Sequence, residues 1–143
     1  MSLRTAEIPD RLRQSEERTL RRLPRLLTFA ALLLIPWIGV LVLQIDGRVG
    51  ARDFANSWIG LDLFEVIALL SLAALVRRRH RGSSPLAAAT SVLFALDAYF
   101  DVMSAAPSLD YLFASLLAYV AELPIALLLA RLSWYTLRWA AQP

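Results

Sequence analysis

Five acidic side chains lie inside long apolar stretches of this sequence: Asp62, Glu65, Asp97, Asp101 and Glu122. Ionisable residues at membrane depth are costly, and where they occur they usually mark a functional site. Carboxylates without histidine or cysteine partners favour hard cations such as Ca²⁺, Mg²⁺, Mn²⁺ and Na⁺, or a proton. We therefore expect these five residues to form a cation site.

Other metal chemistries are excluded by composition. The sequence has no cysteine, and its single histidine, His80, lies in a run of arginines. We expect no haem, no thiolate-ligated metal and no histidine-ligated metal.

The spacing of the five acids places them on shared helix faces. Asp62 and Glu65 are three residues apart, and Asp97 and Asp101 are four apart, so each pair lies on one face of a helix. At 1.5 Å per residue, Asp62 and Asp101 lie roughly 6–8 Å below the outer boundary, Glu65 and Asp97 roughly 10–14 Å, and Glu122 roughly 18–20 Å. Antiparallel helices would bring Asp62 level with Asp101 and Glu65 level with Asp97.

Several carboxylates close together in a medium of low dielectric constant cannot all stay ionised. No arginine lies at the same depth, because Arg131 follows Glu122 by nine residues. The acids therefore hold protons, bind a metal ion, line a wet cavity for a cationic molecule, or pair with basic residues of another subunit. The shallow pair, Asp62 and Asp101, has a simpler alternative, which is to hydrogen-bond near the membrane boundary.

Aromatic residues and prolines accompany the acids. Trp58 lies one turn before Asp62 and either stacks on a cation or anchors the helix at the interface. We also expect Tyr99 and Tyr119 to line the cavity. Pro124 frees the carbonyl of the residue four before it, next to Glu122, which either helps to ligate a cation or accompanies a packing kink.

Two stripes of small residues predict close helix packing. One contains Glu122 and would turn that carboxylate toward the bundle interior. The other lies on a different face from Asp97 and Asp101 and serves packing or self-association. The stripes are Ala114, Ala118, Glu122, Ala126 and Ala130, and Ala87, Ser91 and Ala95.

The elements that carry these residues are apolar helices. The chain has 143 residues, of which 58% are hydrophobic, and this exceeds what a soluble core of that size would bury. Its mean hydropathy is +0.55. Four stretches approach or exceed the roughly 20 residues that a membrane helix needs, at about 26–45, 58–76, 86–106 and 109–137. Because their connections are short, we predict an all-α integral membrane protein with an antiparallel bundle of four transmembrane helices.

The charge distribution predicts the orientation of these helices. The net charge is +3, and all fifteen basic residues are arginines. Seven of them precede the first span, where residues 1–24 are predicted to form a short amphipathic cytoplasmic segment. Four more lie at 77–81, between spans two and three. This asymmetry places both termini in the cytoplasm, with residues 25–143 forming the transmembrane domain in the plasma (inner) membrane. The arginines would face anionic lipid headgroups, and a nucleic-acid partner is not expected.

Three segments resemble a known group of proteins. Residues 58–65 (WIGLDLFE), 97–101 (DAYFD) and 121–124 (AELP) are similar to uncharacterised four-span integral membrane proteins of actinobacteria. The resemblance covers spans two to four and implies the four-span fold, but no activity.

Three functions fit these residues. The first is a small membrane protein whose outward-facing carboxylate pocket binds a divalent metal, a proton or an organic cation, in a transport or relay role. The second is a metal-dependent intramembrane enzyme that acts on a lipid-linked substrate. The third is a structural subunit whose acids pair with a partner. Four spans are few for a complete transporter, so a homo-oligomer or a partner subunit is expected.

Overall fold

The computed structural model describes residues 10–43, 49–105 and 109–140. Its helices are α1 (Asp10–Leu43), α2 (Val49–Arg77), α3 (Ser83–Ser104), α4 (Leu109–Leu117), the π-helical turn η1 (Ala118–Glu122) and α5 (Leu123–Ala140). The described residues contain no strand, which confirms the predicted all-α class. Residues 44–48 and 106–108, which form most of the two predicted outer loops, lie outside the described residues. The side chains of residues 49–58 also lie outside them.

Four helices are long and apolar enough to cross a membrane. Their apolar segments are Arg21–Val40, Ile59–Arg77, Ser83–Ser104 and Tyr111–Trp139, close to the spans predicted from the sequence. Large apolar side chains are exposed as well as buried, and Phe64 and Trp134 are 67% and 80% exposed. Helices that are apolar on every side are typical of a protein surrounded by lipid.

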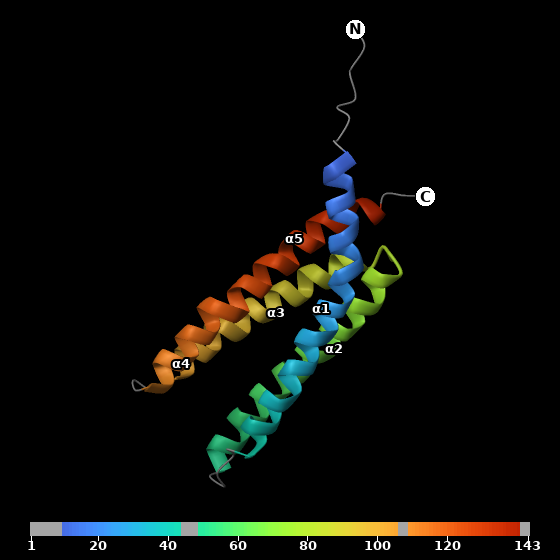
Figure 1. Cartoon of the computed structure of the whole chain (residues 1–143). Helices are drawn as coiled ribbons and strands as arrows, with labels where there is room; N and C mark the ends of the chain where they lie inside the picture. The colour runs from blue at the N-terminus through green and yellow to red at the C-terminus, as the bar shows by residue number, and fades with distance from the viewer. Residues whose placement is uncertain (1–9, 44–48, 106–108, 141–143) are drawn as a thin grey trace.

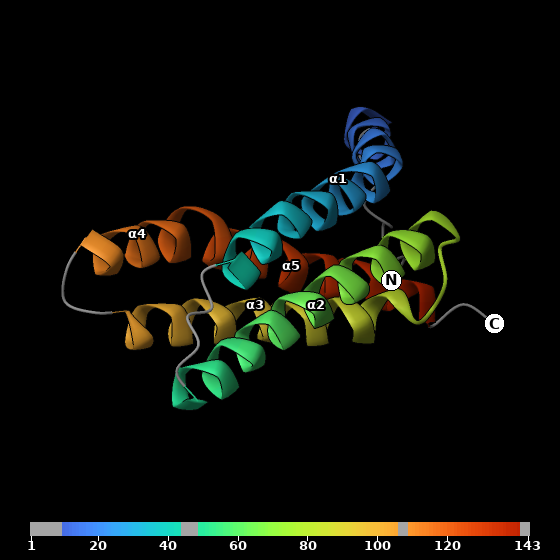
Figure 2. The ribbon, with the colours of Figure 1, turned by 90° about the horizontal axis from the view of Figure 1, so that it is seen from below.

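The helices form two pairs (Figures 1 and 2). α1 packs along α2, and α3 packs along α4, η1 and α5, while α2 and α3 join the pairs. Among the described residues, no Cα atom of α1 lies within 8 Å of one in α4 or α5. The pairs lie closest near the α2–α3 turn and diverge toward the other end (Figure 1). The start of α1 and the end of α5 lie at the same end of the molecule as that turn.

Serine hydroxyls and small residues hold α3 against α5. Ser91 Oγ donates to the carbonyl of Ala126 at 2.8 Å, and Ser84 Oγ donates to that of Ser133 at 2.9 Å. Ala87, between them, is fully buried. The small-residue stripe of the third span is therefore used inside the chain, where it allows close approach to α5.

The turn between α2 and α3 ends α2 with two hydrogen bonds. His80 N–H donates to the carbonyl of Leu75 at 3.0 Å, and Arg79 N–H donates to that of Val76 at 3.1 Å. This is the Schellman arrangement, whose turning residue adopts the left-handed conformation and is usually glycine. Here it is Arg79, with φ of 49°.

α1 is one continuous helix that runs through residue 24, the predicted end of the amphipathic cytoplasmic segment. It contains Pro24 and Pro36, and it bends along its length (Figures 1 and 2). Proline is tolerated inside membrane helices and is a common cause of such bends. Thr28 Oγ donates to the carbonyl of Pro24 at 2.9 Å, which gives that carbonyl a partner.

Candidate cation site

The five acids gather where α2, α3 and η1 meet. Asp62, Glu65 and Asp97 each offer a carboxylate oxygen, and these three oxygens lie within 4.8 Å of one another. Asp97, Asp101 and Glu122 form a second set with the same spread. Because Asp97 belongs to both sets, the acids form one cluster with Asp97 at its centre.

Four of these carboxylates are buried, and three have an oxygen without a partner. Glu65 is only 1% exposed, and Asp62, Asp97 and Glu122 are 4%, 7% and 7% exposed. Asp62 Oδ2, Glu65 Oε1 and Glu122 Oε2 are buried and accept no hydrogen bond. A buried carboxylate oxygen without a partner loses the hydration it has in water and gains nothing in exchange. Such oxygens are expected where a ligand supplies the missing partner.

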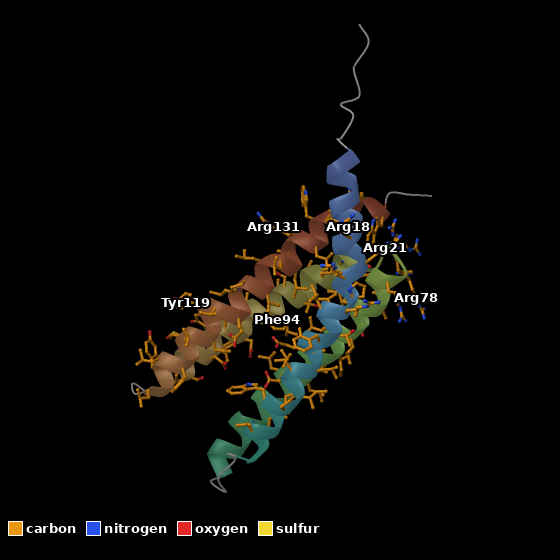
Figure 3. The ribbon with its side chains drawn as sticks, viewed as in Figure 1. Arg18, Arg21, Arg78, Phe94, Tyr119 and Arg131 are labelled. Carbon is orange, nitrogen blue, oxygen red and sulfur yellow. The ribbon has the colours of Figure 1, made fainter. Side chains whose placement is uncertain are left out.

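A cavity of about 280 Å³ joins these carboxylates. Trp37, Leu117 and the carboxylates line the part of the cavity farther from the α2–α3 turn. The part nearer that turn is lined by apolar residues from four helices: Ala30, Leu69, Phe94 and Ile125. Figure 3 shows Phe94 between the two helix pairs. The carboxylates therefore line one part of the cavity, and the part nearer the α2–α3 turn is apolar.

The π-helical turn positions Glu122 in this cavity. The N–H of Leu123 donates to the carbonyl of Ala118, five residues back, instead of four. The next residue, Pro124, has no N–H, and its ring would clash with the carbonyl of Val120 in a regular α-helix. A wider turn relieves this clash, and such turns occur frequently at functional sites. The sequence identifies the proline and the carbonyl but does not predict the π-turn.

The predicted stripe of small residues in the fourth span is only partly buried. Ala118, Glu122 and Ala126 are buried, whereas Ala114 is only partly buried and Ala130 is exposed. Beyond Ala126 the buried positions follow the ordinary helical period instead of steps of four. They are Leu129, Leu132 and Thr136. The inward placement of Glu122 thus agrees with the expectation, but the stripe is shorter than predicted.

The predicted aromatic lining differs from the observed one. Tyr99 and Tyr119 are 57% and 69% exposed, and they line a separate depression of about 240 Å³ beside α3, without a carboxylate. Tyr99 lies two residues from both Asp97 and Asp101, so it projects from the opposite side of the helix. Tyr119 lies within the π-turn, where more residues fit into each turn, so it does not share the face of Glu122. Figure 3 shows Tyr119 on the outer side of its helix.

Two aromatic residues of the cavity are not among those that the sequence predicts. Trp37 lines its carboxylate part and Phe94 its apolar part. Both lie within the predicted spans, and Trp37 is eight residues from the outer end of the first span, about 12 Å deep and therefore near the level of Glu65 and Asp97. The side chain of Trp58 lies outside the described residues, so its predicted position beside Asp62 stays a prediction.

No protein-family model matches this chain, and no curated protein or solved structure is significantly similar to it. The resemblance of spans two to four to actinobacterial membrane proteins therefore stays a prediction from the three motifs alone.

Proposed function

We propose that this chain is an integral protein of the plasma (inner) membrane that binds a cation in its carboxylate cavity, in a transport or relay role. In this proposal the four apolar helices cross the bilayer as an antiparallel bundle. Both termini lie in the cytoplasm, because the arginines gather at that end of the helices. The part of the cavity that carries the carboxylates then lies nearer the outer side.

The observation that carries this proposal is the set of buried, unpartnered carboxylate oxygens around one cavity. Three such oxygens come from Asp62, Glu65 and Glu122, on two different helix pairs. Among the described residues, no arginine side chain forms an ion pair with the cluster. A cation would compensate both the missing hydrogen bonds and the mutual repulsion of the acids.

A divalent metal ion is the first candidate ligand. Oxygens that share one Ca²⁺ lie about 2.3–2.6 Å from it, so that two on opposite sides are separated by about 5 Å. The carboxylate oxygens of Asp62, Glu65 and Asp97 lie within 4.8 Å of one another, which fits this requirement. Oxygen ligands without nitrogen or sulfur are typical of Ca²⁺, Mg²⁺ and Mn²⁺ sites.

An organic cation is the second candidate, and the shape of the cavity favours it. A space of about 280 Å³ exceeds what a bare metal ion needs. Its walls include Trp37 and Phe94, and aromatic faces attract cationic groups. An organic cation would place its charge among the carboxylates and its apolar part against these rings.

A transport or relay role rests on the position of the apolar end of the cavity. Phe94 and Leu69 are 2% and 0% exposed, and they lie between the carboxylates and the arginine-rich end. A ligand that passes from the carboxylates to that end would require these side chains to move. The helix pairs make little contact on the α1 and α5 sides, so relative motion of the pairs is the expected route.

Thermal unfolding of the detergent-purified protein tests this proposal. The panel contains Na⁺, Mg²⁺, Ca²⁺, Mn²⁺ and tetraphenylphosphonium, each measured with wild type, Glu65→Gln and Asp97→Asn. A ligand that binds only the folded state raises the unfolding midpoint. We expect a selective rise that both substitutions abolish.

Asp110→Asn is the matched control, because it removes one carboxylate at the start of α4, about 18 Å along the helix from Glu122. Its midpoint should rise with the same cation as that of wild type. The proposal fails if no cation raises the wild-type midpoint, or if the rise persists in both cluster variants. A co-purifying subunit with no cation response would instead support an assembly role.

A further inference from the structure

A second cavity lies between α1 and α2, near the α2–α3 turn. It is a groove of about 650 Å³, lined at one end by three arginines, Arg21, Arg25 and Arg77. Arg21 and Arg25 are four residues apart on one face of α1, and Arg77 is in the last turn of α2. None of the three guanidinium groups forms an ion pair or hydrogen bond among the described residues.

The rest of the groove is apolar. On α1 it continues through Phe29 and Leu32, which are 60% and 54% exposed, and on α2 through Ala73 and Leu70. These positions follow the arginines at successive helical turns, so each helix presents a single face that is basic at one end and apolar below it. From Arg21 to Leu32 the groove extends about 16 Å along α1.

The arginines stand at the ends of the apolar segments of these helices. Arg21 begins the apolar segment of α1, and Arg77 ends that of α2. In a membrane this boundary is the level of the lipid headgroups. Figure 3 shows nitrogen atoms of arginine side chains gathered at this end of the molecule, around Arg21 and the end of α2.

We propose that this groove binds an anionic phospholipid, with the phosphate between Arg21, Arg25 and Arg77 and an acyl chain along Phe29, Leu32 and Leu70. Guanidinium groups bind phosphate oxygens through paired hydrogen bonds. Basic clefts between membrane helices on the cytoplasmic side are known binding places for such headgroups. A soluble phosphate compound would not use the apolar length of the groove. The proposal requires the chain to span a membrane, but it is independent of the cation site.

The test measures the unfolding midpoint of the protein in mixed micelles as phosphatidylglycerol replaces phosphatidylcholine. Arg21→Gln, Arg25→Gln and Arg77→Gln are combined in one variant. The control variant combines Arg22→Gln, Arg78→Gln and Arg81→Gln, which removes three charges from the same end of the molecule but not from the groove. We expect wild type and control to be stabilised in a saturable way, and the groove variant to need at least about tenfold more phosphatidylglycerol.

Two further measurements distinguish lipid binding in the groove from nonspecific attraction between arginines and anionic lipid. Ala74→Leu keeps every arginine and fills the apolar groove, and it should also weaken the response to phosphatidylglycerol. Glycerol 3-phosphate alone should not reproduce the stabilisation. The proposal is overturned if the two triple variants lose the response equally, if neither loses it, or if glycerol 3-phosphate stabilises wild type as much as the lipid does.

Discussion

Glu65 on α2 and Asp97 on α3 bring carboxylate oxygens within 4.8 Å of each other, and both side chains are more than nine-tenths buried. Two ionised carboxylates at this separation repel strongly, because little water screens them. Neither residue has an arginine beside it among the described residues. A bound cation or proton would reduce the negative charge of this pair. It would thereby stabilise the contact between α2 and α3.

Replacing Glu65 by a neutral residue should increase the thermal stability of the cation-free protein and weaken its cation binding. Without an added cation, Glu65→Gln should raise the unfolding midpoint, because glutamine keeps the side-chain volume but carries no charge to repel Asp97 and needs no proton to become neutral on burial. The same substitution should weaken the binding of the stabilising cation at least about tenfold. Thermal unfolding as a function of cation concentration measures both effects. A variant that binds the cation as wild type does would contradict this prediction.

Part of this site could be predicted from the sequence, because its four apolar segments are long enough to cross a membrane and a membrane limits the possible structures. Long apolar segments must be helices, and short connections place consecutive helices side by side. Counting residues from the outer ends of the helices then places Glu65 and Asp97 at the same depth, and this requires no knowledge of side-chain packing. The π-turn before Pro124 could not be predicted, because a proline inside a helix is compatible with a bend, a break or a π-turn. Extrapolating the stripe in steps of four gave the wrong position for Ala130, because the regular helix after the π-turn repeats every 3.6 residues.

The π-turn gives a second prediction. Pro124→Ala restores an N–H and removes the clash with Val120, so a regular α-helix becomes possible and Glu122 rotates relative to the cavity. We expect cation affinity to fall about tenfold while the midpoint without cation stays the same or rises. Pro36→Ala in α1 is the matched control, because that proline does not line the cavity and is not preceded by a π-turn. Equal cation affinity in wild type and Pro124→Ala would show that the π-turn does not position Glu122.

The interhelical serines give a third prediction. Ser91→Ala removes the hydrogen bond to the carbonyl of Ala126, and its destabilising effect should be about 0.6 kcal/mol, the average for hydrogen bonds between helices in membrane proteins. Ser104→Ala is the control, since Ser104 is exposed and bonds only within its own helix, to Asp101. Reversible unfolding in mixed micelles measures both free energies. An equal effect at the two positions would contradict the prediction.

The conformation of Arg79 gives a fourth prediction. A non-glycine residue in the left-handed region costs roughly 1–2 kcal/mol, and Arg79 has φ of 49°. Arg79→Gly should therefore raise the free energy of unfolding by about 1 kcal/mol. Arg78→Gly removes the same charge from the neighbouring position and should not stabilise the protein. If both variants change the free energy of unfolding equally, the loss of charge, and not the backbone conformation, is responsible.

Proton release on cation binding tests the cation site most directly. The purified protein in weakly buffered detergent solution is titrated with the cation that gives the largest thermal stabilisation, while the pH is recorded. Carboxyl groups that hold protons in the cluster must release them to ligate the cation. We predict a saturable release of protons by wild type and by Asp110→Asn, and none by the double variant Glu65→Gln and Asp97→Asn. Saturable cation binding without proton release in wild type, or equal release by the double variant, would contradict a cation site built from protonated carboxyl groups.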